Sequence, residues 1–230
     1  MSNTYYTLSQ QGKEADIYIF GDITSFPYAA DHKSAGGLIR EIQQLDADVI
    51  NIHIDSYGGS VKEGWGMYSA LKEHRAKVNT YADGFVASAA LYPYLAGDNR
   101  YASVVSAFFL HEVSVGVYGY AEDLRDAADE AEKMTDIGIN AFVESAGMTA
   151  ETVKELMQKE TWLDPTEALE HGIVTSIITT TETQRHTQSV RKAILQALRN
   201  KPPVQVADPA GDPGETNTFS FAKMFASKGE

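Results

Sequence analysis

Predicted strands and helices alternate along most of this chain. Residues 48–54 (DVINIHI) alternate apolar and polar at period two, which predicts a strand, and residues 61–74 follow with a helical pattern. Further strands are predicted at residues 15–21, 77–81, 106–110 and 173–178, and further helices at 37–45, 87–96, 121–146 and from Thr149 onward. This order favours an α/β layered fold with mainly parallel strands.

The character of the chain changes near its end. We predict one folded domain at residues 15–180, preceded by a short segment at 1–14. Residues 181–230 are polar and contain Pro, Gly and Asp, which predicts a flexible tail. No run of about 18 apolar residues is present, so we expect no membrane-spanning helix and no membrane partner.

Charge and cysteine content exclude several kinds of site. The formal net charge is −13, and clustered Lys and Arg are what phosphate binding requires, so we expect no nucleic-acid partner. The chain has no cysteine, which excludes thiol nucleophiles, disulfides and Cys-based metal sites. No His and carboxylate cluster has ligand spacing, so we expect no metal and no cofactor.

Two residues have settings that favour catalysis. His111 follows the apolar strand at residues 106–110, and groups at strand ends commonly form α/β active sites. Ser88 lies among small apolar residues (GFVASAA, 84–90) at the start of a predicted helix. A serine needs a neighbouring base to become nucleophilic, and backbone N–H groups to hold the oxyanion. By local pattern alone, a buried packing serine is at least as good an interpretation for Ser88, and a structural histidine is the better one for His111.

A glycine pair after the strand at 48–54 is the third unusual feature. Gly58 and Gly59 lie in SYGGSV (56–61), where glycines let the backbone approach a ligand and point N–H groups at it. The alternative is an ordinary strand-to-helix turn, and the pattern does not match a phosphate-binding loop.

The three segments together resemble the ClpP-type serine proteases. GGSV with Gly64, GFVASAA and the histidine after FFL occur in that family's order and spacing, and TWLDPTEA (161–168) resembles its closing strand and helix. The resemblance covers residues 17–178 and implies a ClpP/crotonase-like layered fold of repeated ββα units. It also implies that Ser88 is the nucleophile, that His111 is the base, and that the N–H groups of Gly59 and Ala89 form the oxyanion hole.

The third catalytic residue is less clear. The family places an aspartate two residues before the aromatic of the closing strand, and this chain has Glu160 there. A glutamate can still accept a hydrogen bond from an imidazole N–H. Asp164 is the fallback, although its position before Pro165 also suits a helix cap.

The resemblance further implies an assembly and a substrate class. The predicted helix at 121–146 matches the family's protruding handle, and residues 113–120 match the handle strand. We therefore expect a homo-oligomeric ring that cleaves peptide or protein substrates. The variant looks closest to the head maturation (prohead) proteases of tailed phages, which implies capsid or scaffold substrates and a cytoplasmic location, in the host for a phage protein.

Two other interpretations remain open, and a third is disfavoured. A crotonase-type enzyme would act on coenzyme A thioesters without needing Ser88 paired to His111. A Ser–Lys peptidase is disfavoured because no lysine lies between Ser88 and Lys133. A structural or scaffold protein with a retired active site stays possible because of Glu160.

Overall fold

The computed structural model describes residues 6–24 and 34–178. In chain order the elements are β1 (Tyr6–Gln11), β2 (Glu14–Phe20), α1 (Ala35–Gln44), β3 (Val49–Ser56), α2 (Val61–Glu73), β4 (Lys77–Ala87), the short 3-10 helix η1 (Ser88–Ala90), α3 (Leu91–Leu95), β5 (Asn99–Ser103), β6 (Ala107–Leu110), α4 (Ala121–Ala146), α5 (Ala150–Gln158), β7 (Thr161–Leu163), α6 (Pro165–Glu170) and β8 (Ser176–Ile178). The tail predicted at residues 181–230 lies outside the described residues.

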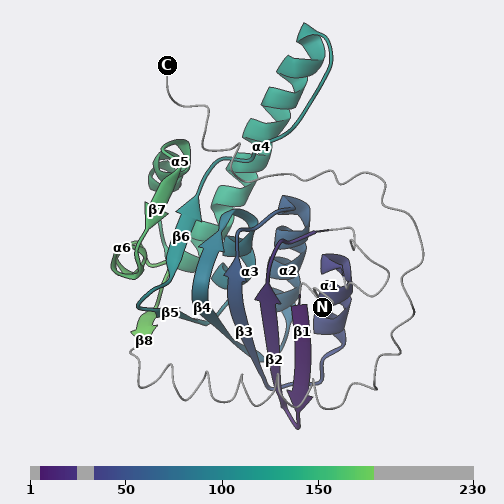
Figure 1. The fold of residues 1–230 in the computed structure, drawn as a ribbon, viewed down its shortest axis with the longest axis vertical. Helices are drawn as coiled ribbons and strands as arrows, with labels where there is room; N and C mark the ends of the chain where they lie inside the picture. The colour runs from purple at the N-terminus through teal and green to yellow at the C-terminus, as the bar shows by residue number, and fades with distance from the viewer. Residues whose placement is uncertain (1–5, 25–33, 179–230) are drawn as a thin grey trace, which may run out of the picture. The chain divides into compact units, whose positions relative to one another are not determined.

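The strands form one sheet in the order β1-β2-β3-β4-β5-β8, with β6 pairing to β4 and β7 (Figure 1). The β1–β2 and β6–β7 pairs are antiparallel, and the other pairs are parallel. The predicted α/β layered fold with mainly parallel strands is confirmed. Because β1 pairs with β2 from Tyr6 onward, the sheet begins before residue 15, where the sequence placed the start of the domain.

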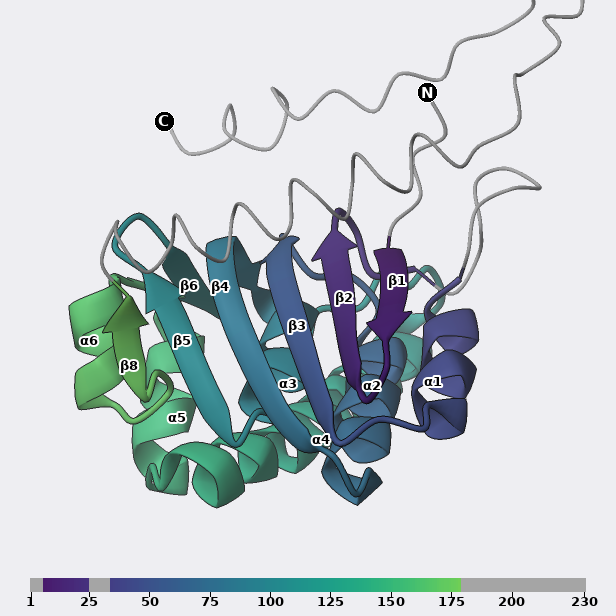
Figure 2. The same ribbon diagram turned by 90° about the horizontal axis from the view of Figure 1, so that it is seen from below.

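Helices α1, α2 and α3 cover one face of this sheet (Figure 2). The alternation at residues 48–54 places Ile50, Ile52 and Ile54 on the covered face, where they are fully buried in the hydrophobic core. Each such side chain contributes about 1.5–3 kcal/mol when it leaves water. No helix among the described residues has the length and apolar character needed to cross a membrane.

Strand β4 changes partner part of the way along its length. Residues 79–82 pair with β5, and residues 85–87 pair with β6. An irregularity separates the two halves: Ile54 faces Ala82, whereas Ser56 faces Val86. The carboxylate of Asp55 accepts a hydrogen bond from the Phe85 N–H at 2.9 Å, which holds the bend. A bulge of this kind redirects the strand end, and here it sends the end of β4 toward β6.

The predicted handle helix is confirmed as α4, which extends beyond the sheet (Figure 1). Its buried residues all lie in its second half, from Thr135 to Phe142, and it ends at Gly147 with φ of 68°. The predicted handle strand is wrong, because residues 113–120 form no strand. The strand predicted at 77–81 continues to Ala87, so the predicted helix at 87–96 begins later, at Ser88.

Gly138 allows α4 to approach α3 closely. A Cβ placed on Gly138 would overlap the hydroxyl oxygen of Tyr92, a rigid side chain that is 5 % exposed. We therefore expect Gly138→Ala to lower the free energy of unfolding by about 1–2 kcal/mol, although alanine favours helix. Removing the oxygen with Tyr92→Phe should restore much of this loss in the double variant, as measured by urea unfolding.

A glycine elsewhere provides the control for this change. In α1, a Cβ on Gly36 would meet only Glu63, at 3.9 Å. Gly36→Ala should therefore leave stability unchanged or raise it by up to about 1 kcal/mol. Equal destabilisation by Gly138→Ala with and without the Tyr92 hydroxyl would contradict the proposed clash.

Candidate active site

Ser88 stands on a strained turn at the end of β4. Its φ is 55°, in the left-handed region that residues other than glycine seldom adopt, and η1 begins at this residue. Backbone strain of this kind costs about 1 kcal/mol or more and persists where the surrounding structure holds it in place. Because β4 ends at Ala87, the turn places the Ser88 hydroxyl at the carboxyl end of the strand, where Ser88 lines a pocket.

His111 lies within hydrogen-bond distance of Ser88. Its Nε2 is 2.7 Å from the Ser88 Oγ. The pairing of β4 with β6 causes this contact, since Ala87 and Phe109 are register partners and the two residues follow shortly after them. The imidazole also stacks on the Phe109 ring, with centroids 5.4 Å apart. For Nε2 to accept the serine proton, the ring must carry its own proton on Nδ1.

Gly58 and Gly64 pack directly against the backbone of this turn. A Cβ on Gly58 would lie 2.5 Å from the Ala87 carbonyl oxygen and 2.8 Å from the Ala89 nitrogen, and its φ is +93°. A Cβ on Gly64 would lie 2.7 Å from the Ala89 carbonyl oxygen. These glycines are needed because the start of α2 packs directly against the Ser88 turn.

Two backbone N–H groups border the same space. Gly59 and Ala89 both line the pocket that contains Ser88. The Ile23 N–H donates to the Gly58 carbonyl, the Ser60 N–H donates to the Ile23 carbonyl, and the Gly58 N–H donates to the Ser56 hydroxyl. Within the described part of the chain, no such bond is made by the N–H of Gly59. Ala89 is in the first turn of η1, where N–H groups have no partner in their own helix. Both groups are therefore placed to donate to a ligand.

Glu160 occupies the register position opposite His111. In the antiparallel β6–β7 pair, Leu110 faces Thr161, so the next pair outward would join His111 to Glu160. Glu160 has φ of 50°, and it and Ser88 are the two residues other than glycine with positive φ in the described chain. Its side chain is exposed, and it makes no hydrogen bond to His111 in this structure.

Asp164 has a different task. Its Oδ1 accepts hydrogen bonds from the N–H groups of Thr166 (2.7 Å) and Glu167 (2.9 Å) at the start of α6. Glu167 completes a capping box by accepting from the Asp164 N–H. The carboxylate of Asp164 thus stabilises a helix end rather than pointing to His111.

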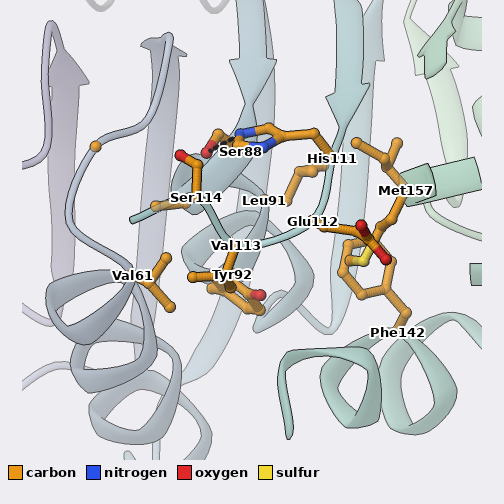
Figure 3. A pocket seen from close by; sticks show the side chains of 13 residues that line it. Val61, Ser88, Leu91, Tyr92, His111, Glu112, Val113, Ser114, Phe142 and Met157 are labelled. Carbon is orange, nitrogen blue, oxygen red and sulfur yellow. Dashed lines mark hydrogen bonds between the residues drawn. The ribbon is translucent and has the colours of Figure 1, made fainter. Parts of the chain in front are cut away.

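A pocket opens beside the serine (Figure 3). Its walls are both polar and apolar and come from the glycine turn before α2, α2, η1, α3, α4, α5, the end of β6 and the segment after it: Gly59, Val61, Ser88, Ala89, Leu91, Tyr92, Leu110, His111, Glu112, Val113, Ser114, Phe142 and Met157. Burial raises the pKa of Tyr92, so its hydroxyl stays protonated well beyond neutral pH. Among the described residues, no group of three or more acidic or histidine side chains is placed to hold a metal ion.

Sequence patterns alone do not identify this pocket. Phe142 and Met157 come from helices far along the chain from Ser88, and only the packing of α4 and α5 brings them to it. Apolar residues at helical spacing mark a buried face, but they do not reveal which part of that face stays open.

A strained serine at a strand end, within hydrogen-bond distance of a histidine, is the arrangement of a serine hydrolase site. The family model described as Clp protease matches residues 4–181. The chain is 31% identical over 172 residues to the ATP-dependent Clp protease proteolytic subunit of Paracoccus denitrificans, covering 74% of this chain and 84% of that protein. It is 31% identical over 153 residues to subunit 2 of Pseudomonas aeruginosa, covering 64% and 76%.

A solved structure agrees with these sequence matches. A point mutant of ClpP1 from Listeria monocytogenes superposes with a TM-score of 0.61 at 25% identity, covering 72% of this chain and 91% of that one. The chain therefore belongs to the Clp protease family, and it is a serine-type peptidase.

Proposed function

We propose that this protein is an endopeptidase that cleaves protein substrates through an acyl-enzyme on Ser88. The observation that carries the proposal is the 2.7 Å contact between Ser88 Oγ and His111 Nε2 at the edge of a pocket. His111 takes the serine proton during attack on the carbonyl carbon and gives it to the leaving amine. Water then attacks the ester by the same route, which releases the second product and restores the serine.

The oxyanion of each tetrahedral intermediate is proposed to bind the N–H groups of Gly59 and Ala89. Both groups line the pocket and have the free donors described above. Donors fixed by the backbone need no reorganisation during the reaction, and the loss of one such donor typically costs about 10²–10³ in rate.

Glu160 is proposed as the third catalytic residue. Its register position opposite His111 and its strained φ of 50° support this role, and the cap formed by Asp164 removes the competing carboxylate. The Nδ1 proton of His111 requires an acceptor, and rotation of the exposed Glu160 side chain is proposed to supply it.

Substitutions of Glu160 should separate its catalytic from its structural effect. Glu160→Gln is expected to lower kcat at least about 100-fold, because the imidazolium loses its charged partner. Glu160→Gly should lower kcat similarly but raise the free energy of unfolding by about 1 kcal/mol, since glycine adopts positive φ without a Cβ. Peptide hydrolysis and urea unfolding measure the two effects.

Asp164→Asn is the matched control for Glu160→Gln. Asparagine caps helices as well as aspartate does, so this variant should keep both stability and activity. A large loss of kcat in Asp164→Asn with normal activity in Glu160→Gln would assign the third role to Asp164 instead.

A homo-oligomeric ring is proposed as the working assembly. The relatives named above are ATP-dependent subunits, and the first half of α4 extends into solvent with Leu124 47 % exposed. An exposed helix of this kind gains stability by packing against another copy. Light scattering should give a mass of several protomers, and a monomeric mass would contradict the ring.

Phage head maturation stays a prediction from the sequence, because the relatives named above are bacterial Clp subunits. Capsid or scaffold substrates would be supported if the protein cleaved a co-expressed capsid precursor and Ser88→Ala did not. Removal of the tail at residues 181–230 in the same cells would support self-processing.

The peptidase proposal is tested with an unfolded protein and a coenzyme A thioester in parallel. We expect cleavage of the unfolded protein that disappears in Ser88→Ala, because the acyl-enzyme cannot form. Thioester hydrolysis that survives Ser88→Ala, with no protein cleavage by the wild type, would overturn the proposal in favour of a crotonase-type reaction.

A further inference from the structure

One charged side chain interrupts the apolar wall of the pocket beside Ser88. Leu91, Leu110, Phe142 and Met157 line this wall although each is at most 4 % exposed, so the hydrocarbon surface they offer is narrow, whereas Glu112 is exposed and supplies a carboxylate. Glu112 is the single acidic or basic residue of the pocket lining apart from His111. The side chain extends toward Met157 and Phe142, away from Ser88 (Figure 3).

Both neighbours of Glu112 are held by hydrogen bonds. The imidazole of His111 before it contacts the Ser88 hydroxyl, and the backbone N–H of Val113 after it donates to the Thr135 Oγ1 on α4 at 2.9 Å. Thr135 is 4 % exposed and also donates to the Ala131 carbonyl, so the acceptor itself is held in place. The position of Glu112 in the pocket therefore follows from the fold, although its carboxylate remains open to solvent.

We propose that Glu112 makes this pocket select a lysine or arginine side chain. The proposal rests on the proposed peptidase function. Because Ser88 and His111 both line this pocket, we place in it the side chain of the residue that contributes the scissile carbonyl, termed P1 here. The aliphatic stem of lysine or arginine packs on the apolar wall while its cationic end reaches the carboxylate.

The net charge of the whole chain also favours cationic substrates. A formal net charge of −13 attracts cationic substrates and repels acidic ones. The Glu112 carboxylate is exposed, so its contribution is modest and falls with salt. We expect an uncharged side chain such as that of norleucine to enter the pocket as well, with Glu112 setting the preference between side chains of equal length.

The test uses peptides that differ only at P1, with lysine, norleucine, arginine or glutamate. Norleucine has the carbon stem of lysine without the charge, so the ratio of kcat/KM for lysine over norleucine isolates the electrostatic part. We expect this ratio to be about fivefold in wild type at low salt, to approach one in Glu112→Gln and to fall below one in Glu112→Lys. Added salt should lower the wild-type ratio.

Glu151→Gln is the matched control, since Glu151 is an exposed glutamate on α5 outside the pocket. It should leave the lysine-to-norleucine ratio unchanged. An equal ratio in wild type and Glu112→Gln, with the norleucine peptide still cleaved, would overturn the specificity proposal and leave the peptidase function standing. Failure to cleave any of the peptides would overturn both.

Discussion

Replacing Ser88 with alanine is expected to lower kcat for peptide hydrolysis by at least about 10³-fold, with little change in the fold. The alanine lacks the oxygen that forms the acyl-enzyme, while the pocket and the backbone donors stay in place. His111→Ala should cause a similar loss, because the serine hydroxyl at 2.7 Å then has no base to accept its proton. Steady-state hydrolysis of a P1-matched peptide measures both.

The double variant provides a sharper criterion. Residues that act as a unit have non-additive effects, so Ser88→Ala with His111→Ala should be no slower than either single change. Ser176→Ala on β8 and His171→Ala at the end of α6 are matched controls outside the pocket, and both should keep activity. Additive losses in the double variant would show that the two residues act separately.

The second large effect is expected for Gly58→Ala. The added Cβ would lie 2.5–2.8 Å from the backbone of Ala87 and Ala89 and from the Ser88 Cβ, none of which can move without shifting the catalytic turn. We expect a loss of about 3 kcal/mol or more in unfolding free energy and loss of hydrolysis even where the variant folds. Thermal unfolding and peptide hydrolysis check the two effects.

Gly21→Ala separates the steric clash from backbone strain. Gly21 has φ of +120°, close to the +93° of Gly58, but a Cβ there would meet nothing within 4 Å. This control should lose about 1–2 kcal/mol and keep its activity. Equal losses of unfolding free energy and of hydrolysis in the two variants would mean that the positive φ alone, and not the contact with the Ser88 turn, requires glycine at position 58.

The sequence predicted the elements whose signals are local. Period-two alternation at residues 48–54 placed β3, and Asp164 followed by Pro165 placed the start of α6, because caps and faces depend on neighbouring residues. The functional interpretation of the glycine pair, Ser88 and His111 depended on the family resemblance in their order and spacing, because each motif alone also had a structural interpretation.

What the sequence missed depends on pairing between distant segments. The bend at Asp55 lets β4 continue to Ala87, and no local pattern distinguishes this strand end from the start of a buried helix. The sequence named Glu160 only through the family resemblance, and the register of the β6–β7 pair supplies the physical reason for its place opposite His111. Likewise, the place of Glu112 in the pocket depends on the Val113 contact with Thr135.

The most direct test of the central claim is labelling with a fluorophosphonate, followed by mass spectrometry to locate the adduct. An activated serine attacks phosphorus as it attacks a carbonyl, so the reagent reports the nucleophile without a known substrate. The Ser88–His111 pair predicts about one adduct per protomer, located on Ser88, absent in Ser88→Ala and strongly slowed in His111→Ala. Equal labelling of all three proteins, or an adduct on another residue, would contradict it.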